Sequence, residues 1–106
     1  MIIRITIDKG QFDEENIYIY CPNQINIRKK SIKSKFFEWY DYADNEEYEL
    51  AKSIYGNSTL EDMMVYWINK YLLDYDYGNK AYVLKDNINE IKNYDININI
   101  DRYFYD

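Results

Sequence analysis

Carboxylate side chains are concentrated in one segment of the chain, and their spacing indicates binding to a positively charged surface. Six acidic residues and no basic residue lie between Phe36 and Ala51, interleaved with aromatic residues. Like charges four residues apart destabilise a helix by about 0.2–0.5 kcal/mol per pair, so the pattern indicates a use outside folding. A partner with a positive surface would supply that use. The acids are Glu38, Asp41, Asp44, Glu46, Glu47 and Glu49.

Four of these acids recur at every third residue, from Glu38 through Asp41 and Asp44 to Glu47. On a helix each step advances about 4.5 Å, close to the spacing of about 3.4 Å between phosphates along one DNA strand. Because each step also drifts by about 60° around the helix, only three of the four share a face. Such a surface would imitate a short run of phosphates. An ordinary solvated acidic face is the alternative.

We predict a partner-binding surface that combines these acids with neighbouring tyrosines, whose rigid, amphipathic rings are enriched at protein interfaces. Its central acids, Asp44 and Glu47, are expected to face solvent. Three further acids in residues 13–15 would extend the surface if their loop folds nearby. The predicted partner-binding residues are Glu38, Asp41, Tyr42, Asp44, Glu46, Glu47, Tyr48 and Glu49.

Residue types that carry catalysis or hold cofactors are scarce. The chain has no histidine, the commonest general base and transition-metal ligand. Cys21 is its single cysteine and alternates with isoleucines, which predicts a buried, unreactive thiol. No glycine-rich phosphate loop is present, and the acids of residues 74–78 lack the later glutamate of a calcium loop, so a turn is expected there. We predict no catalytic residue, no cofactor and no metal site.

The charge balance opposes direct binding of nucleic acid. The net charge is −6, and five of the thirteen basic residues lie within residues 28–35. Affinity for a phosphate backbone depends on Lys and Arg, so we expect no nucleic acid as a direct ligand. We interpret the basic segment as a solvated helix start, with a functional basic patch as the alternative.

Length and hydropathy bound the location of the protein. A chain of 106 residues suits one globular domain over residues 1–106. No run of about 18 apolar residues could span a membrane, and Arg4 interrupts the core that a signal peptide would need. A lone cysteine fits a reducing compartment. We therefore expect a cytoplasmic protein of a bacterial host cell, with no membrane partner.

Period-two alternation of isoleucines predicts the strands. It is clearest in residues 2–8 and 96–101, and it is typical of strands with one buried face. Residues 17–21 are expected to form the hairpin partner of the first strand, after a polar loop over residues 9–15. A short strand is expected at residues 81–85, and residues 25–27 either extend the second strand past a bulge or start another short strand.

Apolar residues at three- and four-residue steps predict helices in the middle of the chain. Residues 31–55 form either two helices or one, and a capping-box pattern at residues 58–61 opens a helix over residues 59–74. Trp39 and Trp67 fall on apolar helical faces, so both are expected in the core. The patterns together predict an α+β fold: a mostly antiparallel sheet of about four strands, in the order β-β-α-α-β-β, with two or three helices on one face.

The size, acidity and AT-rich composition of the chain have a counterpart among known proteins. It holds fourteen tyrosines, sixteen isoleucines and twelve asparagines, residues that AT-rich codons favour. In these properties it resembles the small acidic inhibitors of phages and mobile elements, particularly anti-CRISPR proteins. The resemblance implies a protein without catalysis that occupies the nucleic-acid-binding groove of a CRISPR effector and sets the six acids against its Lys and Arg residues.

Two other functions fit the same sequence, and a third is disfavoured by it. An immunity protein or antitoxin that neutralises a basic toxin nuclease would use the same acids and tyrosines. A phage structural module or homo-oligomer would use the tyrosines for self-association. A small carboxylate-dependent metal nuclease is disfavoured by the negative charge and by the missing histidine.

Overall fold

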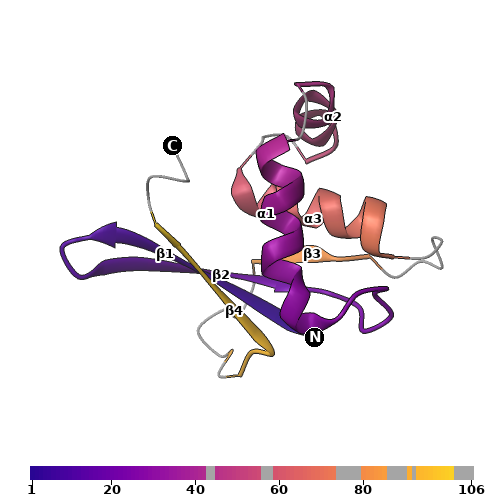
Figure 1. The fold of residues 1–106 in the computed structure, drawn as a ribbon. Coiled ribbons are helices and arrows are strands. Elements are labelled where there is room, and N and C mark those ends of the chain that lie inside the picture. Colours follow the sequence, from indigo (N-terminus) through magenta and orange to yellow (C-terminus); the bar gives the residue numbers. More distant parts are fainter. Residues whose placement is uncertain (43–44, 56–58, 74–79, 86–90, 92, 102–106) are drawn as a thin grey trace.

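The fold is a four-stranded sheet with its helices on one face (Figure 1). The computed structural model describes residues 1–42, 45–55, 59–73, 80–85, 91 and 93–101, with the backbone alone at residues 42, 45, 48, 51, 55 and 101. The strands are β1 (Ile2–Gly10), β2 (Asp13–Tyr20), β3 (Tyr82–Leu84) and β4 (Ile96–Asp101). The helices are α1 (Ile32–Tyr42), α2 (Asn45–Tyr55) and α3 (Leu60–Trp67), with a 3-10 turn η1 (Lys29–Ser31) before α1 and a π-helix η2 (Ile68–Leu72) after α3.

The strand order in the sheet is β3-β2-β1-β4. The pairs β1–β2 and β2–β3 are antiparallel, whereas β4 runs parallel to β1. A parallel neighbour needs a long crossover connection, which the helices and β3 supply. The predicted α+β class and mostly antiparallel sheet are confirmed, and the parallel β1–β4 pair is the exception.

Alternating isoleucines of the central strands form the floor of the core. Ile3 and Ile5 of β1 are fully buried, as are Ile19 of β2 and Ile98 of β4. In the β1–β4 register Ile5 lies opposite Ile98, so the buried faces of both strands coincide. Because side chains alternate across a strand, this register turns one row of isoleucines toward the helices, as predicted.

The helices close the core from one side. α1 inserts Ile32 and Phe36, and every residue of α3 except the two acids of its first turn is buried. Figure 1 shows α1 and α3 over the sheet and α2 beyond the end of α1, farther from the strands. The segment 31–55 therefore forms two helices. α2 leaves Leu50 and Ile54 largely exposed.

Several predicted boundaries were wrong. The expected polar loop over residues 9–15 is mostly strand, because β1 and β2 continue to a tight turn at residues 11–12. Residues 25–27 form no strand: Ile25 makes one isolated bridge, to Leu73. By contrast, the helix predicted over roughly residues 59–74 is confirmed: α3 and η2 follow each other from Leu60 to Leu72, and the N-cap is Thr59, whose hydroxyl accepts from the Asp62 backbone N–H.

The remaining predicted elements fall into two groups. Strands were expected at residues 81–85 and 96–101, and β3 and β4 confirm them. The turn expected at residues 74–78 lies outside the described residues, as does most of the segment 86–93.

Candidate functional site

The acids of α1 and α2 form two exposed pairs. Glu38 and Asp41 lie three residues apart on α1, and Glu46 and Glu49 lie three residues apart on α2. That spacing places each pair on one side of its helix. Glu46 lies in the first turn of α2, where the helix dipole favours negative charge, which offsets part of the cost of the like charges.

Glu38 has one basic neighbour. The Lys35 ammonium lies 3.6 Å from its carboxylate, and both side chains are more than half exposed. An exposed ion pair of this kind contributes about 0.2–0.5 kcal/mol. Another cation can therefore replace Lys35 at the Glu38 carboxylate.

Glu47 is turned inward, so its predicted solvent-facing position was wrong. Its side chain is 19 % exposed. The carboxylate accepts hydrogen bonds from the Tyr66 hydroxyl, from Lys70 Nζ at 2.9 Å and from the Tyr71 hydroxyl at 2.8 Å. This cluster of four side chains, the Glu47 cluster, attaches α2 to α3 and η2.

The Glu47 cluster also perturbs the ionisation of its members. Burial alone would raise the pKa of Glu47, but the hydrogen bonds from Tyr66, Lys70 and Tyr71 outweigh it and lower that pKa. Burial and the bond to Glu47 raise the pKa of Tyr66, and bonds to Tyr66 and Glu47 raise that of Lys70. The cluster therefore holds a carboxylate and an ammonium at neutral pH.

The three-residue stripe of acids is divided by the fold. Glu38 and Asp41 belong to α1, while Glu47 belongs to α2 and faces α3. Asp44 lies outside the described residues, as do the side chains of Tyr42 and Tyr48. A continuous row of phosphate-like charges on one helix is therefore absent from the described residues, and the exposed acids described on α1 and α2 are the two pairs.

A groove of about 390 Å³ adjoins Glu38 of α1. Its walls include Glu38 and Trp39 from α1, Trp67 at the end of α3 and Tyr71 from η2. Trp67 is buried, as predicted, whereas Trp39 is only partly buried. The sequence placed Tyr71 on the same apolar helical face as Trp67, four residues earlier, but Tyr71 was not predicted as a site residue.

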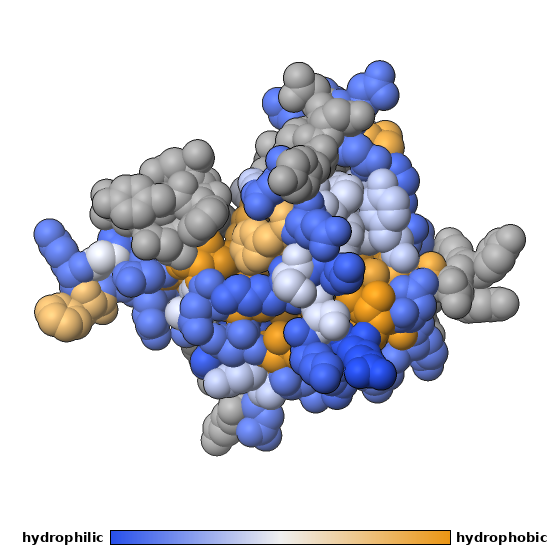
Figure 2. Space-filling view, viewed as in Figure 1, coloured by the Kyte–Doolittle hydropathy of each residue, from blue (hydrophilic) through white to orange (hydrophobic). Residues whose placement is uncertain are grey.

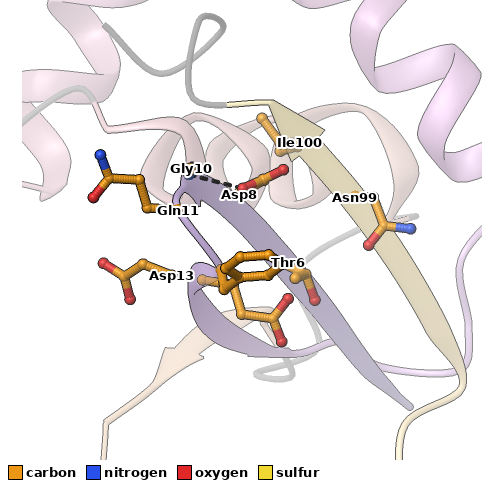
Figure 3. Close-up of a pocket in the computed structure, with 9 residues that line it drawn as sticks. Thr6, Asp8, Gly10, Gln11, Asp13, Asn99 and Ile100 are labelled. Atoms are coloured by element: carbon orange, nitrogen blue, oxygen red, sulfur yellow. Dashed lines mark hydrogen bonds between the residues drawn. The ribbon is translucent and has the colours of Figure 1, made fainter.

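A second, larger cavity of about 700 Å³ lies at the β1–β2 hairpin (Figure 3). Asp8 accepts a hydrogen bond from the Gly10 N–H at 2.8 Å, which fixes the turn, and Asp13 and Glu14 also line the cavity. Figure 1 shows this hairpin projecting away from α1 and α2. The suggestion that the acids of residues 13–15 extend the helical acidic surface was therefore wrong.

The hairpin turn carries an exposed aromatic residue. Phe12 is fully exposed. Figure 2 shows a hydrophobic colour at the hairpin tip, next to hydrophilic residues. Gln11 and Phe12 have φ angles of 53° and 64°. Positive φ at both central residues is typical of type I′ hairpin turns, which favour Asn-Gly.

Candidate metal ligands in the described part of the chain are its carboxylates and its single thiol. No group of three or more Cys, Asp or Glu side chains there is arranged to hold a metal ion. Cys21 is buried, as predicted, and burial raises its pKa to about 11, so the thiol stays protonated at neutral pH. No helix among the described residues has the length and apolar character needed to cross a membrane.

The basic segment 28–35 lies along η1 and the start of α1. Its lysines are exposed. Lys29 lies 3.5 Å from Asp95 and Lys35 pairs with Glu38, so two of its cations have acidic neighbours within the chain.

Comparison with known proteins gave no relative. Neither a protein-family model, nor a curated protein, nor a solved structure matches the chain. The functional argument therefore depends on its own residues and their geometry.

Proposed function

We propose that this protein is a non-catalytic inhibitor that binds the basic, nucleic-acid-binding groove of another protein. The observation that carries the proposal is the pair of exposed acidic positions on each of two consecutive helices, Glu38 with Asp41 and Glu46 with Glu49. No basic residue interrupts the segment from Phe36 to Ala51. A surface serving solubility alone would mix both signs of charge.

The partner class is a CRISPR effector, in keeping with the anti-CRISPR-like size, acidity and composition of the chain. Such an effector holds its guide and target strands in a positively charged channel. Complementary charge accelerates encounter and disfavours wrong partners. Two acidic pairs on separate helices replace the single phosphate-like row that the sequence suggested.

Charge reversal tests this function. We expect Asp41→Lys with Glu49→Lys to fold normally, because both residues are exposed, and to weaken inhibition of a susceptible CRISPR nuclease by at least tenfold. Glu47 is left intact because it belongs to the Glu47 cluster. The readout is cleavage of target DNA at increasing inhibitor concentration.

The matched control reverses two acids on the hairpin, Asp13→Lys with Glu14→Lys. It changes the net charge equally but lies away from α1 and α2 (Figure 1). We expect this variant to inhibit nearly as well as the wild type. Equal loss in both variants would show that net charge matters and the α1–α2 surface does not.

A further inference from the structure

The groove between α1 and η2 combines aromatic walls with a carboxylate. It holds both tryptophans of the chain, Trp39 and Trp67, together with Tyr71. The Trp39 and Tyr71 ring centroids are 6.1 Å apart at 54°, and the Trp67 ring packs edge-on against Phe36 at 5.5 Å. These ring contacts hold in place the aromatic side chains that form the walls of the groove.

One wall of this groove already stacks a cation. The Lys70 ammonium lies 5.3 Å from the centroid of the Tyr71 ring, within the range of a cation–π contact. The same ammonium is bonded to Glu47, so it is held in place. The negative face of an aromatic ring attracts cations, and the partly buried ring of Trp39 offers the same property to a ligand.

The carboxylate at the groove is Glu38. Its neighbour Lys35 also lines the groove and lies 3.6 Å from the carboxylate, in an exposed pair. An ammonium on a flexible stem is a point charge, whereas a guanidinium meets a carboxylate through two parallel hydrogen bonds. A guanidinium from a partner can therefore displace Lys35 from Glu38.

We propose that this groove binds an arginine side chain of the basic partner. The inference rests on the proposed function and names the group that the surface recognises. The guanidinium plane stacks on the indole of Trp39 and its N–H groups donate to Glu38. Arginine is favoured over lysine because the guanidinium is planar and more weakly hydrated.

Tryptophan fluorescence tests the groove without the natural partner. The probe is an acetylated, amidated peptide of alternating glycine and arginine, and the matched probe carries citrulline, which is neutral and of similar shape. Because both tryptophans line the groove, their emission, excited where tyrosine does not absorb, reports binding directly. We expect the arginine peptide to give a saturable change and the citrulline peptide to give none. Equal responses to the two peptides would overturn the proposal.

Three variants assign the response to individual side chains. We expect Glu38→Gln to weaken binding of the arginine peptide about tenfold, because a charge-assisted pair of hydrogen bonds is lost. Lys35→Met should strengthen binding about twofold to fivefold by removing the competing cation. The control Glu14→Gln makes the same charge change on the hairpin and should bind as the wild type does. Equal weakening by Glu38→Gln and Glu14→Gln would overturn the inference.

The two proposals fail in different ways. If arginine-peptide binding is absent while Asp41→Lys with Glu49→Lys still weakens inhibition at least tenfold, the groove inference is wrong and the proposed function stands. If the peptide binds as expected and the charge reversal leaves inhibition unchanged, the groove recognises arginine and the proposed acidic surface is wrong.

Discussion

Phe12 occupies a backbone conformation that an ordinary side chain adopts at a cost. The left-handed region costs about 1–2 kcal/mol for a residue with a Cβ atom, and both Gln11 and Phe12 have positive φ angles. The exposed ring of Phe12 gains little from burial in return. The tip of the β1–β2 hairpin therefore stores strain.

Replacing this turn should stabilise the protein. We expect Gln11→Asn with Phe12→Gly to raise the free energy of unfolding by about 1 kcal/mol, since Asn-Gly suits a type I′ turn and the entropy cost of glycine offsets part of the gain. For a domain of this size that corresponds to an increase in Tm of about 4–8 °C. Phe12→Ala is the control, because it removes the ring and keeps the Cβ atom. An equal gain in the control would locate the strain in the ring.

Glu47 should contribute to the stability of the fold. We expect Glu47→Gln to lower the free energy of unfolding by about 1.5–3 kcal/mol, because hydrogen bonds to a charged group are lost from a mostly buried position. Chemical denaturation at neutral pH measures the difference. Glu49→Gln on the same helix is exposed and should change stability by less than about 0.5 kcal/mol.

The stabilisation from Glu47 should depend on pH. Its folded-state pKa is lowered, so the contribution is complete above the unfolded-state pKa of about 4.3 and is lost as the pH falls through the folded-state value. The difference in unfolding free energy between the wild type and Glu47→Gln should be constant from about pH 6 to 8 and shrink in acid. A difference that grows on acidification would contradict the assigned hydrogen bonds.

At the scale of the elements, Asn69 links η2 to Ala81, the residue directly before β3. The Asn69 amide donates to the Ala81 carbonyl at 3.1 Å and accepts from the Ala81 N–H at 2.8 Å. These bonds satisfy both backbone groups of a buried residue. The π-helical turn that contains Asn69 also contains Lys70 and Tyr71, which bond to Glu47.

Removing this link should loosen the edge of the sheet. We expect Asn69→Ala to lower the free energy of unfolding by about 1–3 kcal/mol, because two buried backbone groups lose their partners. Hydrogen exchange should show faster exchange of the β3 amides. Asn93→Ala, at an exposed position, is the control and should behave like the wild type. Unchanged exchange in Asn69→Ala would show that β3 is held by its pairing with β2.

The charge of the protein as a whole should govern its interactions in solution. At a net charge of −6 the free protein should bind neither single- nor double-stranded DNA at physiological salt, because few groups can neutralise phosphates. A gel shift measures this, and sub-micromolar binding would contradict it. Association with the basic partner should slow steeply as salt rises, since exposed charges are screened over about 8–10 Å.

Local patterns in the sequence determined most elements of this fold. The alternating isoleucines of β1 and β4 and the apolar face of α3 depend on residues within a few positions of one another, so they can be recognised from the sequence of this chain alone. The missing histidine and the crowded acids of residues 38–49 were visible in the same way.

Only the tertiary structure decided which side chains meet. Glu47 bonds to Tyr66 and Tyr71, which lie 19 and 24 residues away, and β4 pairs with a strand more than 90 residues earlier. No local pattern encodes such distances, because they depend on how helices pack on the sheet. That packing turned one predicted surface acid inward, left Glu38 beside an aromatic groove and moved the hairpin acids to the far end of the sheet.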